Sequence, residues 1–411
     1  MMPQAIVCNC NYNGLSIIQE LGIHGINCIA MDCQRSIGTY SKYAKYIRCP
    51  DPISHEEDFI RFLYDYCSKQ NKKPIIFPTN DHWAIALSKY KKKLNEVSIP
   101  CVADWEATEN LVHKNKFYEI GREKGYLIPK TWNNESKKNV TDENFPLVAK
   151  PIIRRTTSNA ANKSFISNMD RLRLTLLPTR KEFDEFVRRE SSLLDKLVFQ
   201  EYVRGLSDSM YTVGIYANRN TDILGLFTGH KVRGYPALSG DCIVGERASI
   251  PDYVIENTKR IVKELHYCGI AEFEYKKDEV TGNFFLIEVN PRSWSWIGIT
   301  PASGVNLPLI AYCDLSGEKI EQSESDSEIK TIKYVKVFED IQNCLFRYKT
   351  DYKKWSKTLV EWKNDIKADK LIFAEHNAGD WPILFIAGIK SLLMFIYNSP
   401  CYLKIRFKDY L

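Results

Sequence analysis

The fold is decided by FFLIEVNPR, residues 284–292, read together with AEFEY, residues 271–275. The segment between them, DEVTGN, has the composition of a hairpin turn. Because residues i and i+2 of a strand point to the same face, Glu288 and Asn290 should project together, and a hairpin would bring Glu274 alongside them. Two carboxylates and an amide oxygen on one face suit Mg²⁺ that is shared with nucleotide phosphates. A surface hairpin with ordinary solvated acids is the alternative that these residues alone leave open.

Composition points to a soluble protein of more than one domain. The chain has 411 residues, of which 44% are hydrophobic and 26% are charged. The formal charge of +6 is small for this length, and no Lys/Arg-dense run with interleaved aromatic residues is found, so we expect no nucleic-acid partner. Twelve scattered cysteines without a CxxC pair, and a start without a basic leader, predict reduced thiols and a cytoplasmic location.

The N-terminal part alternates short apolar runs with helix-like segments, and this βαβ rhythm predicts a small parallel sheet with helices on its faces. The expected strands are residues 5–10, 27–31 and 74–77, and the expected helices are residues 15–21 and 56–68. The loop NYNG after the first strand has one glycine, whereas a dinucleotide fingerprint has three, so we expect no NAD there.

Further elements are expected downstream, before a linker. The strands are residues 145–151, 197–203, 211–216 and 224–232, and the helices are residues 113–125, 180–194 and 258–265. The Ser- and Glu-rich stretch 316–329 is the clearest linker, and the Lys-, Tyr- and Trp-rich tail beyond it is expected to form a separate unit.

In this order the segments resemble the ATP-grasp superfamily, and within it the carboxylate–amine ligases that are similar to D-aspartate ligase and to short carbamoyl-phosphate-synthase-like proteins. The motifs that carry the resemblance are IEVNPR, GVNLPLIAY, SKYAKYIRCPDP and IIFPTNDHW, and it covers roughly residues 4–320. It implies an α/β (α+β) chain with the ATP-grasp fold and an N-terminal parallel-sheet domain. The implied domains are residues 1–110, the nucleotide- and metal-binding residues 111–320, and a C-terminal extension, residues 321–411.

The resemblance also implies which residues bind the adenylate part of ATP. Two lysines, the backbone after one strand and a carboxylate for the ribose hydroxyls occupy the family's positions: Lys114 (with neighbouring Lys116 as the alternative), Lys150, Glu201, Tyr202, Val203 and Asp208. Lys150, in VAKP, corresponds to the strand-borne lysine at the α-phosphate and adenine edge. A solvated charge is the ordinary explanation for a single lysine, so the assignment depends on the whole framework.

For the phosphates, Lys231 and Arg233 alternate along the strand in GHKVRGYP and should share a face. The resemblance makes them the cations that meet ATP phosphates and an acyl phosphate, and makes Arg292 the arginine that steadies the transferred phosphate. The metal ligands are then Glu274, Glu288 and Asn290, and the implied cofactors are ATP and Mg²⁺ (or Mn²⁺). His230 would point to the other face of its strand, so we expect a structural role for it.

One departure concerns the phosphate-covering flap, which is usually a Gly/Ser loop in this family. The corresponding segment here, IIRRTTSNAANKS, contains no glycine. Backbone N–H groups can still cradle phosphate, and Arg154, Arg155 and Lys163 can supply positive charge. The missing glycine slightly favours a protein that binds nucleotide without catalysis.

The implied activity is an ATP-dependent joining of a carboxylate to an amine through an acyl phosphate, with ADP and phosphate as products. The alternatives are a regulatory nucleotide-binding module and a bicarbonate- or carbamoyl-phosphate-type enzyme. Small carboxylate and amine substrates, amino-acid or glycan-linked, should meet between the N-terminal sheet and the nucleotide domain, and a homodimer is a further expectation. The candidate lining groups there are residues 11–14 and 79–81, Trp294 and Trp296; for both tryptophans core packing is an equal alternative.

The most apolar tract is WPILFIAGIKSLLMFIY, residues 381–397, which lies at the lower limit of length for a membrane span and contains Lys390. Basic residues follow at Lys404, Arg406 and Lys408. Such a pattern arises when a C-terminal helix packs on its own enzyme, which is the expectation favoured here. Docking of the same helix on anionic lipid is the less favoured alternative.

Overall fold

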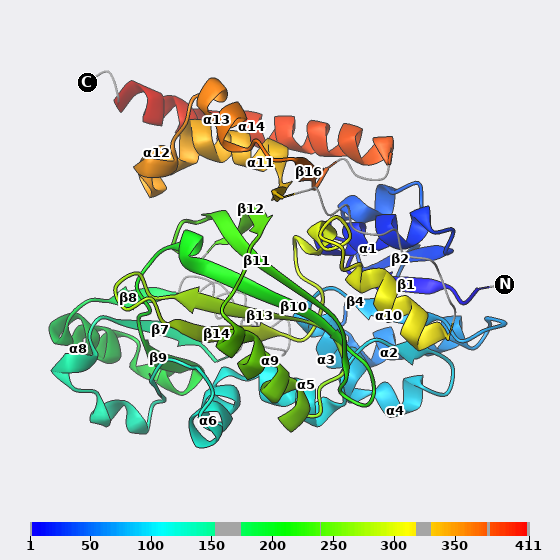
Figure 1. Ribbon diagram of the computed structural model, residues 1–411, viewed down its shortest axis with the longest axis horizontal. Coiled ribbons are helices and arrows are strands. Elements are labelled where there is room, and N and C mark those ends of the chain that lie inside the picture. The colour runs from blue at the N-terminus through cyan, green and yellow to red at the C-terminus, as the bar shows by residue number, and fades with distance from the viewer. Residues whose placement is uncertain (1, 153–173, 239, 318–329, 376–378, 409–411) are drawn as a thin grey trace.

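The computed structural model describes residues 2–152, 174–238, 240–317, 330–375 and 379–408, and it contains three sheets (Figure 1). The N-terminal sheet has five parallel strands in the order β3-β2-β1-β4-β5. Its strands are β1 (Ala5–Cys8), β2 (Cys28–Asp32), β3 (Ala44–Arg48), β4 (Ile75–Pro78) and β5 (Ile99–Pro100). Its helices are α1 (Tyr12–Ile23), α2 (Glu56–Cys67), α3 (Asp81–Lys89) and α4 (Lys91–Leu94), with the 3-10 turn η1 (Ile37–Tyr40).

Every residue of β1, β2 and β4 is buried, because helices cover both faces of this sheet. The predicted parallel sheet is therefore confirmed. The loops after β1 and β4 leave the sheet at the same edge, since the two strands are parallel neighbours. This carboxyl-terminal edge is where ligands bind in open α/β sheets.

The second sheet is antiparallel, in the order β6-β9-β7-β8. Its strands are β6 (Thr131–Trp132), β7 (Leu147–Pro151), β8 (Thr175–Leu177) and β9 (Leu197–Glu201), and the preceding helices are α5 (Trp105–Val112) and α6 (Lys114–Lys124). α6 ends at Gly125, whose φ of 65° suits glycine. Helix α8 (Arg180–Arg189) packs Phe183 and Phe186 on Phe199 of β9 and so covers one face.

The third sheet has seven strands in the order β14-β13-β10-β11-β12-β15-β16. They are β10 (Met210–Ala217), β11 (Ile223–Tyr235), β12 (Asp241–Arg247), β13 (Gly269–Lys277), β14 (Phe284–Asn290), β15 (Ile332–Val335) and β16 (Lys370–Phe373), with helices α9 (Asp252–Glu264) and α10 (Leu307–Ser316). The predicted hairpin is β13–β14, in which Glu274 pairs with Glu288 and Glu272 with Asn290.

The C-terminal tail, expected from its composition to form a separate unit, begins instead as part of the third sheet. The structure corrects that expectation. β15 pairs with β12 and β16 with β15, so both strands extend the third sheet, and Ile332 and Tyr334 belong to a core shared with the N-terminal domain. The remaining helices are α11 (Val337–Gln342), α12 (Tyr348–Asp351), α13 (Leu359–Asp365) and α14 (Trp381–Lys408). In Figure 1, α14 runs along the outer edge at the top of the molecule, with α11 beneath it. Residues 318–329 of the expected linker lie outside the described residues.

Candidate active site

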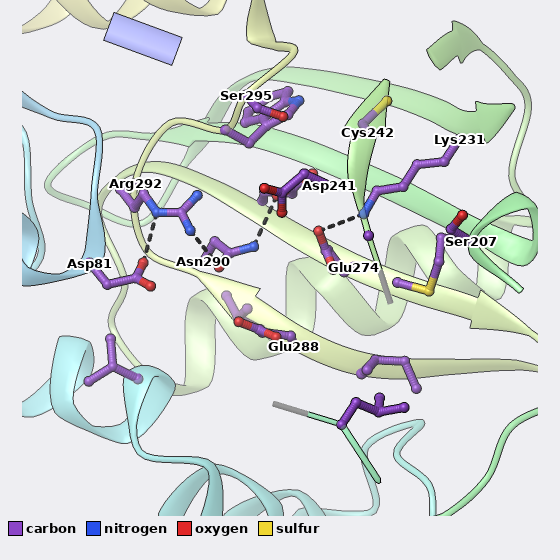
Figure 2. A pocket seen from close by; sticks show the side chains of 18 of the residues that line it. Asp81, Ser207, Lys231, Asp241, Cys242, Glu274, Glu288, Asn290, Arg292 and Ser295 are labelled. Atoms are coloured by element: carbon purple, nitrogen blue, oxygen red, sulfur yellow. Dashed lines mark hydrogen bonds and ion pairs between the residues drawn. The ribbon is translucent and has the colours of Figure 1, made fainter. Parts of the chain in front are cut away.

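A cavity of about 500 Å³ lies where the three sheets meet (Figure 2). Its lining comes from the loops after β1 and β4, from β7, β9, β11, β13 and β14, and from Lys336 between β15 and α11. Most of the residues that the sequence singled out lie in this lining: Asn11, Asn13, Thr79, Asp81, Lys114, Lys150, Glu201, Tyr202, Val203, Lys231, Glu274, Glu288, Asn290, Arg292, Trp294 and Trp296.

The acidic centre of the cavity is built by the β13–β14 hairpin. Its register sets Glu274 opposite Glu288, so the strands place both carboxylates on the cavity side with Asn290, as period-two alternation predicts. Figure 2 shows Glu274, Glu288 and Asn290 around one space.

Glu272 is a fourth member of this centre that the sequence reasoning missed. It is 3% exposed and accepts hydrogen bonds from Thr212 Oγ1 and from Asn290 Nδ2, each at 3.0 Å. Burial, and then the negative charge of Glu274, raise the pKa of its carboxyl to about 8. The alternation in AEFEY was a signal for it, because Glu272 and Glu274 are separated by one residue.

The oxygen atoms of Glu274, Glu288 and Asn290 are of the type that a hard divalent cation prefers, but only two of the three residues are acidic. Two carboxylates and an amide oxygen face one space, and the Glu272 carboxyl lies beside them in the same lining, so a cation there would meet several oxygen donors. Within the described residues there is no group of three His, Cys, Asp or Glu side chains in metal-binding geometry, so the amide would have to serve as the third ligand. Asn290 Oδ1 accepts a hydrogen bond from Arg292 at 2.9 Å, which leaves one lone pair of that oxygen.

Two buried lysines neutralise the two candidate metal ligands in this structure. Lys231 Nζ lies 2.9 Å from Glu274 Oε1, and Lys114 Nζ lies 3.3 Å from Glu288 Oε2. Burial alone would lower the pKa of Lys231, but Glu274 and Glu272 outweigh it and raise that pKa. Lys116 instead pairs with Glu109 at 2.8 Å, and its side chain is 43% exposed, so Lys114 is the better candidate for the nucleotide.

At the other end of the cavity, Lys150 of β7 donates to Gln200 Oε1 of β9 at 2.7 Å. The backbone N–H groups of Glu201 and Tyr202 donate to the carbonyls of Lys130 and Pro146. For Val203, which follows β9, no hydrogen-bond partner of the N–H group is found within the described part of the chain. That N–H group is therefore suited to an acceptor on the adenine edge.

Arg292 links the hairpin to the N-terminal domain. Its Nε donates to Asp81 Oδ1 at 2.7 Å, and a second guanidinium nitrogen donates to Asn290 (Figure 2). Asp81 begins α3, at the carboxyl edge of the parallel sheet. The arginine therefore lies between the acidic centre and the carboxyl edge of the N-terminal sheet.

The structure corrects the expectation for Arg233. A β-bulge between Lys231 and Arg233 breaks the alternation that was assumed, and Arg233 turns away from the cavity lining. It is 2% exposed and donates to both oxygens of Asp340, at 3.0 and 2.6 Å, while also pairing with Asp365. Arg233 therefore holds the C-terminal helices to the sheet.

Asp208, expected at the ribose, also lies outside the cavity lining of the described residues. Its carbonyl accepts from His230 Nε2 at 2.6 Å, and burial followed by the charge of Glu279 raises the pKa of its side chain. His230 also contacts Glu246 at 3.0 Å through Nδ1. Its expected structural role agrees with these contacts, whereas a ribose contact by Asp208 does not follow from them.

Trp294 and Trp296 combine the two roles that the sequence left open. Each is 1% exposed and packs on Phe227, yet both line the cavity. Their indole N–H groups are buried, and no hydrogen-bond partner for them is found among the described residues. The flap residues Arg154, Arg155 and Lys163 lie outside the described residues.

Lys336 is a cavity residue that nothing in the sequence indicated. It is 6% exposed, and its Nζ lies 5.4 Å from the centre of the Tyr12 ring. Within the described part of the chain no ion pair of Lys336 within 4 Å is found, but its charge acts on the buried Glu375, whose pKa it lowers against the larger effect of burial. A buried ammonium in a cavity wall, with no close ion pair, suits an anionic ligand.

Comparison with solved structures places this architecture in the ATP-grasp fold, as the sequence predicted. An L-amino acid ligase from Bacillus licheniformis has a TM-score of 0.56 at 18% identity, covering 80% of this chain and 77% of that one. N5-carboxyaminoimidazole synthetase from Staphylococcus aureus complexed with ADP has a TM-score of 0.57 at 13% identity, covering 78% and 79%. At these identities the likeness shows the fold.

Among characterised sequences, D-aspartate ligase of Enterococcus faecium (strain Aus0004) is 25% identical in an alignment of length 272 that covers 62% of this chain. The chain thus spans 62% of the length of that relative. No family model matches the chain. The resemblance to carboxylate–amine ligases that was drawn from motifs is confirmed by this similarity.

Proposed function

We propose that the protein is an ATP-dependent carboxylate–amine ligase that works through an acyl phosphate. The observation that carries the proposal is the convergence of an acidic hairpin, Glu274 and Glu288, with Lys231 and Arg292 in one cavity. Phosphoryl transfer requires in-line positioning and charge neutralisation more than covalent help from the protein. The carboxylates of this cavity can position a metal ion and the phosphates, and its lysine and arginine can neutralise the charge of the phosphates.

In the first step a carboxylate oxygen of the acid attacks the γ-phosphorus of ATP, and ADP leaves. Glu274, Glu288 and Asn290 would hold Mg²⁺ (or Mn²⁺), which when bound neutralises phosphate charge. Lys231 and Arg292 would donate to the transferred group, where negative charge develops. For Lys231 this means exchanging part of its contact with Glu274 for a phosphate oxygen.

In the second step the amine nitrogen attacks the acyl carbon, the bond from that carbon to the phosphate oxygen breaks, and the departing phosphate takes up the proton that the nitrogen loses. The acyl phosphate is an anhydride that water would hydrolyse, so the site must exclude water. Trp294 and Trp296 form a buried wall beside the acidic centre and serve that purpose. Arg292 stays between the two substrates through its contact with Asp81.

The acid is proposed to be an amino acid or another small acid with a second anionic group. The similarity to a D-aspartate ligase supports this class. Lys336 offers a buried positive charge in the cavity wall, beside Tyr12 of the N-terminal domain, where a second carboxylate can bind. Cytoplasmic location and a homodimer remain predictions.

The test is ADP release by the purified protein with Mg-ATP, an amine donor mixture, and a panel of amino acids and small dicarboxylates that starts with D-aspartate. With an ¹⁸O-labelled carboxylate, an acyl phosphate would transfer one label to the phosphate released. Acid-dependent ADP release with label in phosphate supports the proposal. ATP binding without acid-dependent turnover across the panel would favour the non-catalytic nucleotide-binding alternative.

A further inference from the structure

The C-terminal helix α14 exposes most of the apolar tract that the sequence singled out. Trp381–Asn398 is long and apolar enough to cross a membrane by length and composition alone, yet only 11% of it is buried. Phe385, Leu392 and Ile396 are 66, 59 and 57% exposed. Packing on the enzyme, the favoured expectation, therefore accounts for only a narrow strip of this helix.

The packed strip holds the helix along the surface of the protein. Ile383 and Ala387 are buried against η1 and neighbouring residues, and Ser391 accepts from Gln342 Nε2. Just before the helix, the Asp380 carboxylate accepts from Gln19, Ser41 and the Lys42 N–H group. These contacts extend over about three turns. The helix would have to abandon them to cross a bilayer.

The exposed strip is continuous along the opposite side of the helix. Its residues follow one another at spacings of three, four or one, which places them on one face of an α-helix: Trp381, Phe385, Ile389, Leu392, Leu393 and Ile396. Tyr397, 85% exposed, ends the tract as Trp381 begins it. Trp, Phe and Leu side chains on one face are typical of helices that lie in the plane of the membrane interface.

The charge of the helix is of one sign. Between Trp381 and Lys408 the sequence contains Lys390, Lys404, Arg406 and Lys408 and no acidic residue. Lys390 is exposed at the flank of the apolar strip, with Nζ 5.7 Å from the centre of the Tyr40 ring. An exposed apolar face on a helix whose charged residues are all cationic is complementary to an anionic lipid surface.

We propose that α14 docks the protein on an anionic bilayer, with the helix axis parallel to the membrane and its exposed strip in the interface. In Figure 1 the helix occupies an outer edge of the molecule, so a flat surface can reach it. The proposal goes beyond the ligase activity and does not depend on it. A protein held in this way can act on substrates that are displayed at the membrane.

The test is co-sedimentation of the full-length protein with vesicles of phosphatidylcholine alone and with about one third phosphatidylglycerol. The expected result is binding to the anionic vesicles that weakens with added salt. The triple variant Phe385→Ser/Leu392→Ser/Ile396→Ser should reduce that binding at least about tenfold, since interfacial affinity scales with buried apolar area. The matched control Leu224→Ser/Val280→Ser changes residues that are 45 and 68% exposed elsewhere and should leave binding unchanged.

Circular dichroism of each variant checks that the fold is retained, as expected for exposed positions. Absence of vesicle binding, or equal binding by the triple variant and wild type, would overturn the proposal. Binding that resists both high salt and alkaline carbonate would show a spanning helix instead of a docked one. A dimer in solution that the triple variant converts to a monomer, without lipid binding, would assign the strip to a second copy of the chain.

Discussion

Substitution of Arg233 by Met separates a structural role from a catalytic one. Arg233 is buried and donates to both oxygens of Asp340, whose side chain is 0% exposed. Removing the guanidinium leaves the buried Asp340 carboxylate with two neutral side-chain donors among the described residues, Trp362 Nε1 at 2.8 Å and Cys344 Sγ at 3.8 Å. Loss of one partner of a buried ion pair costs about 3–5 kcal/mol. We therefore expect destabilisation of that size.

The assay is urea unfolding of wild type and variant, followed by tryptophan fluorescence, together with ATP turnover of the folded protein. The double variant Arg233→Met/Asp340→Leu is the matched control, because removing both charges restores much of the lost stability. Asp365, which also pairs with Lys357 at 3.2 Å, retains a partner in both variants. A stable Arg233→Met protein with strongly reduced turnover would refute the structural role and restore the catalytic one.

Three further predictions concern ligands and pH. Lys150→Ala should weaken ATP binding roughly tenfold or more by calorimetry, as expected for a charged hydrogen bond, whereas the exposed Lys116→Ala should not; equal dissociation constants would disprove the assignment. Lys336→Gln should raise the KM for the acid at least about tenfold without changing that for ATP, and an unchanged acid KM would remove Lys336 from the substrate site. Burial raises the pKa of Glu375 to about 7 from 4.5, so its neutral form stabilises the fold below pH 4.5, and that contribution falls as pH rises to 7. The difference in Tm between Glu375→Gln and wild type should therefore favour the variant more at pH 8 than at pH 5. A difference that does not change with pH would contradict this.

The parts of the site that sequence predicted are those governed by local periodicity. The hairpin at residues 278–283 and the alternation of Glu288 and Asn290 depend on turn composition and on the period of a strand, which short stretches reveal. Glu272 had the same signal and was overlooked. Arg233 was placed wrongly, because a β-bulge is not visible in a pattern of two residues.

Long-range pairing accounts for most of what the sequence did not predict. β15 pairs with β12, which precedes the linker, and the sequence of its four residues does not indicate which strand it pairs with. Lys336, which follows that strand, enters the cavity for the same reason. The exposure of α14 was equally hidden, because its sequence is apolar on nearly every side and does not show which side packs.

The most direct test of the central claim is ATP turnover by Glu288→Gln at saturating acid. Glu288 faces Glu274 across the hairpin and is the anionic ligand whose loss changes the charge of the centre without changing its shape. Loss of that ligand should cost on the order of 3 kcal/mol of transition-state stabilisation, roughly a hundredfold in rate. We predict a folded protein with acid- and Mg²⁺-dependent ADP release reduced by about that factor, and turnover close to that of wild type would contradict the account.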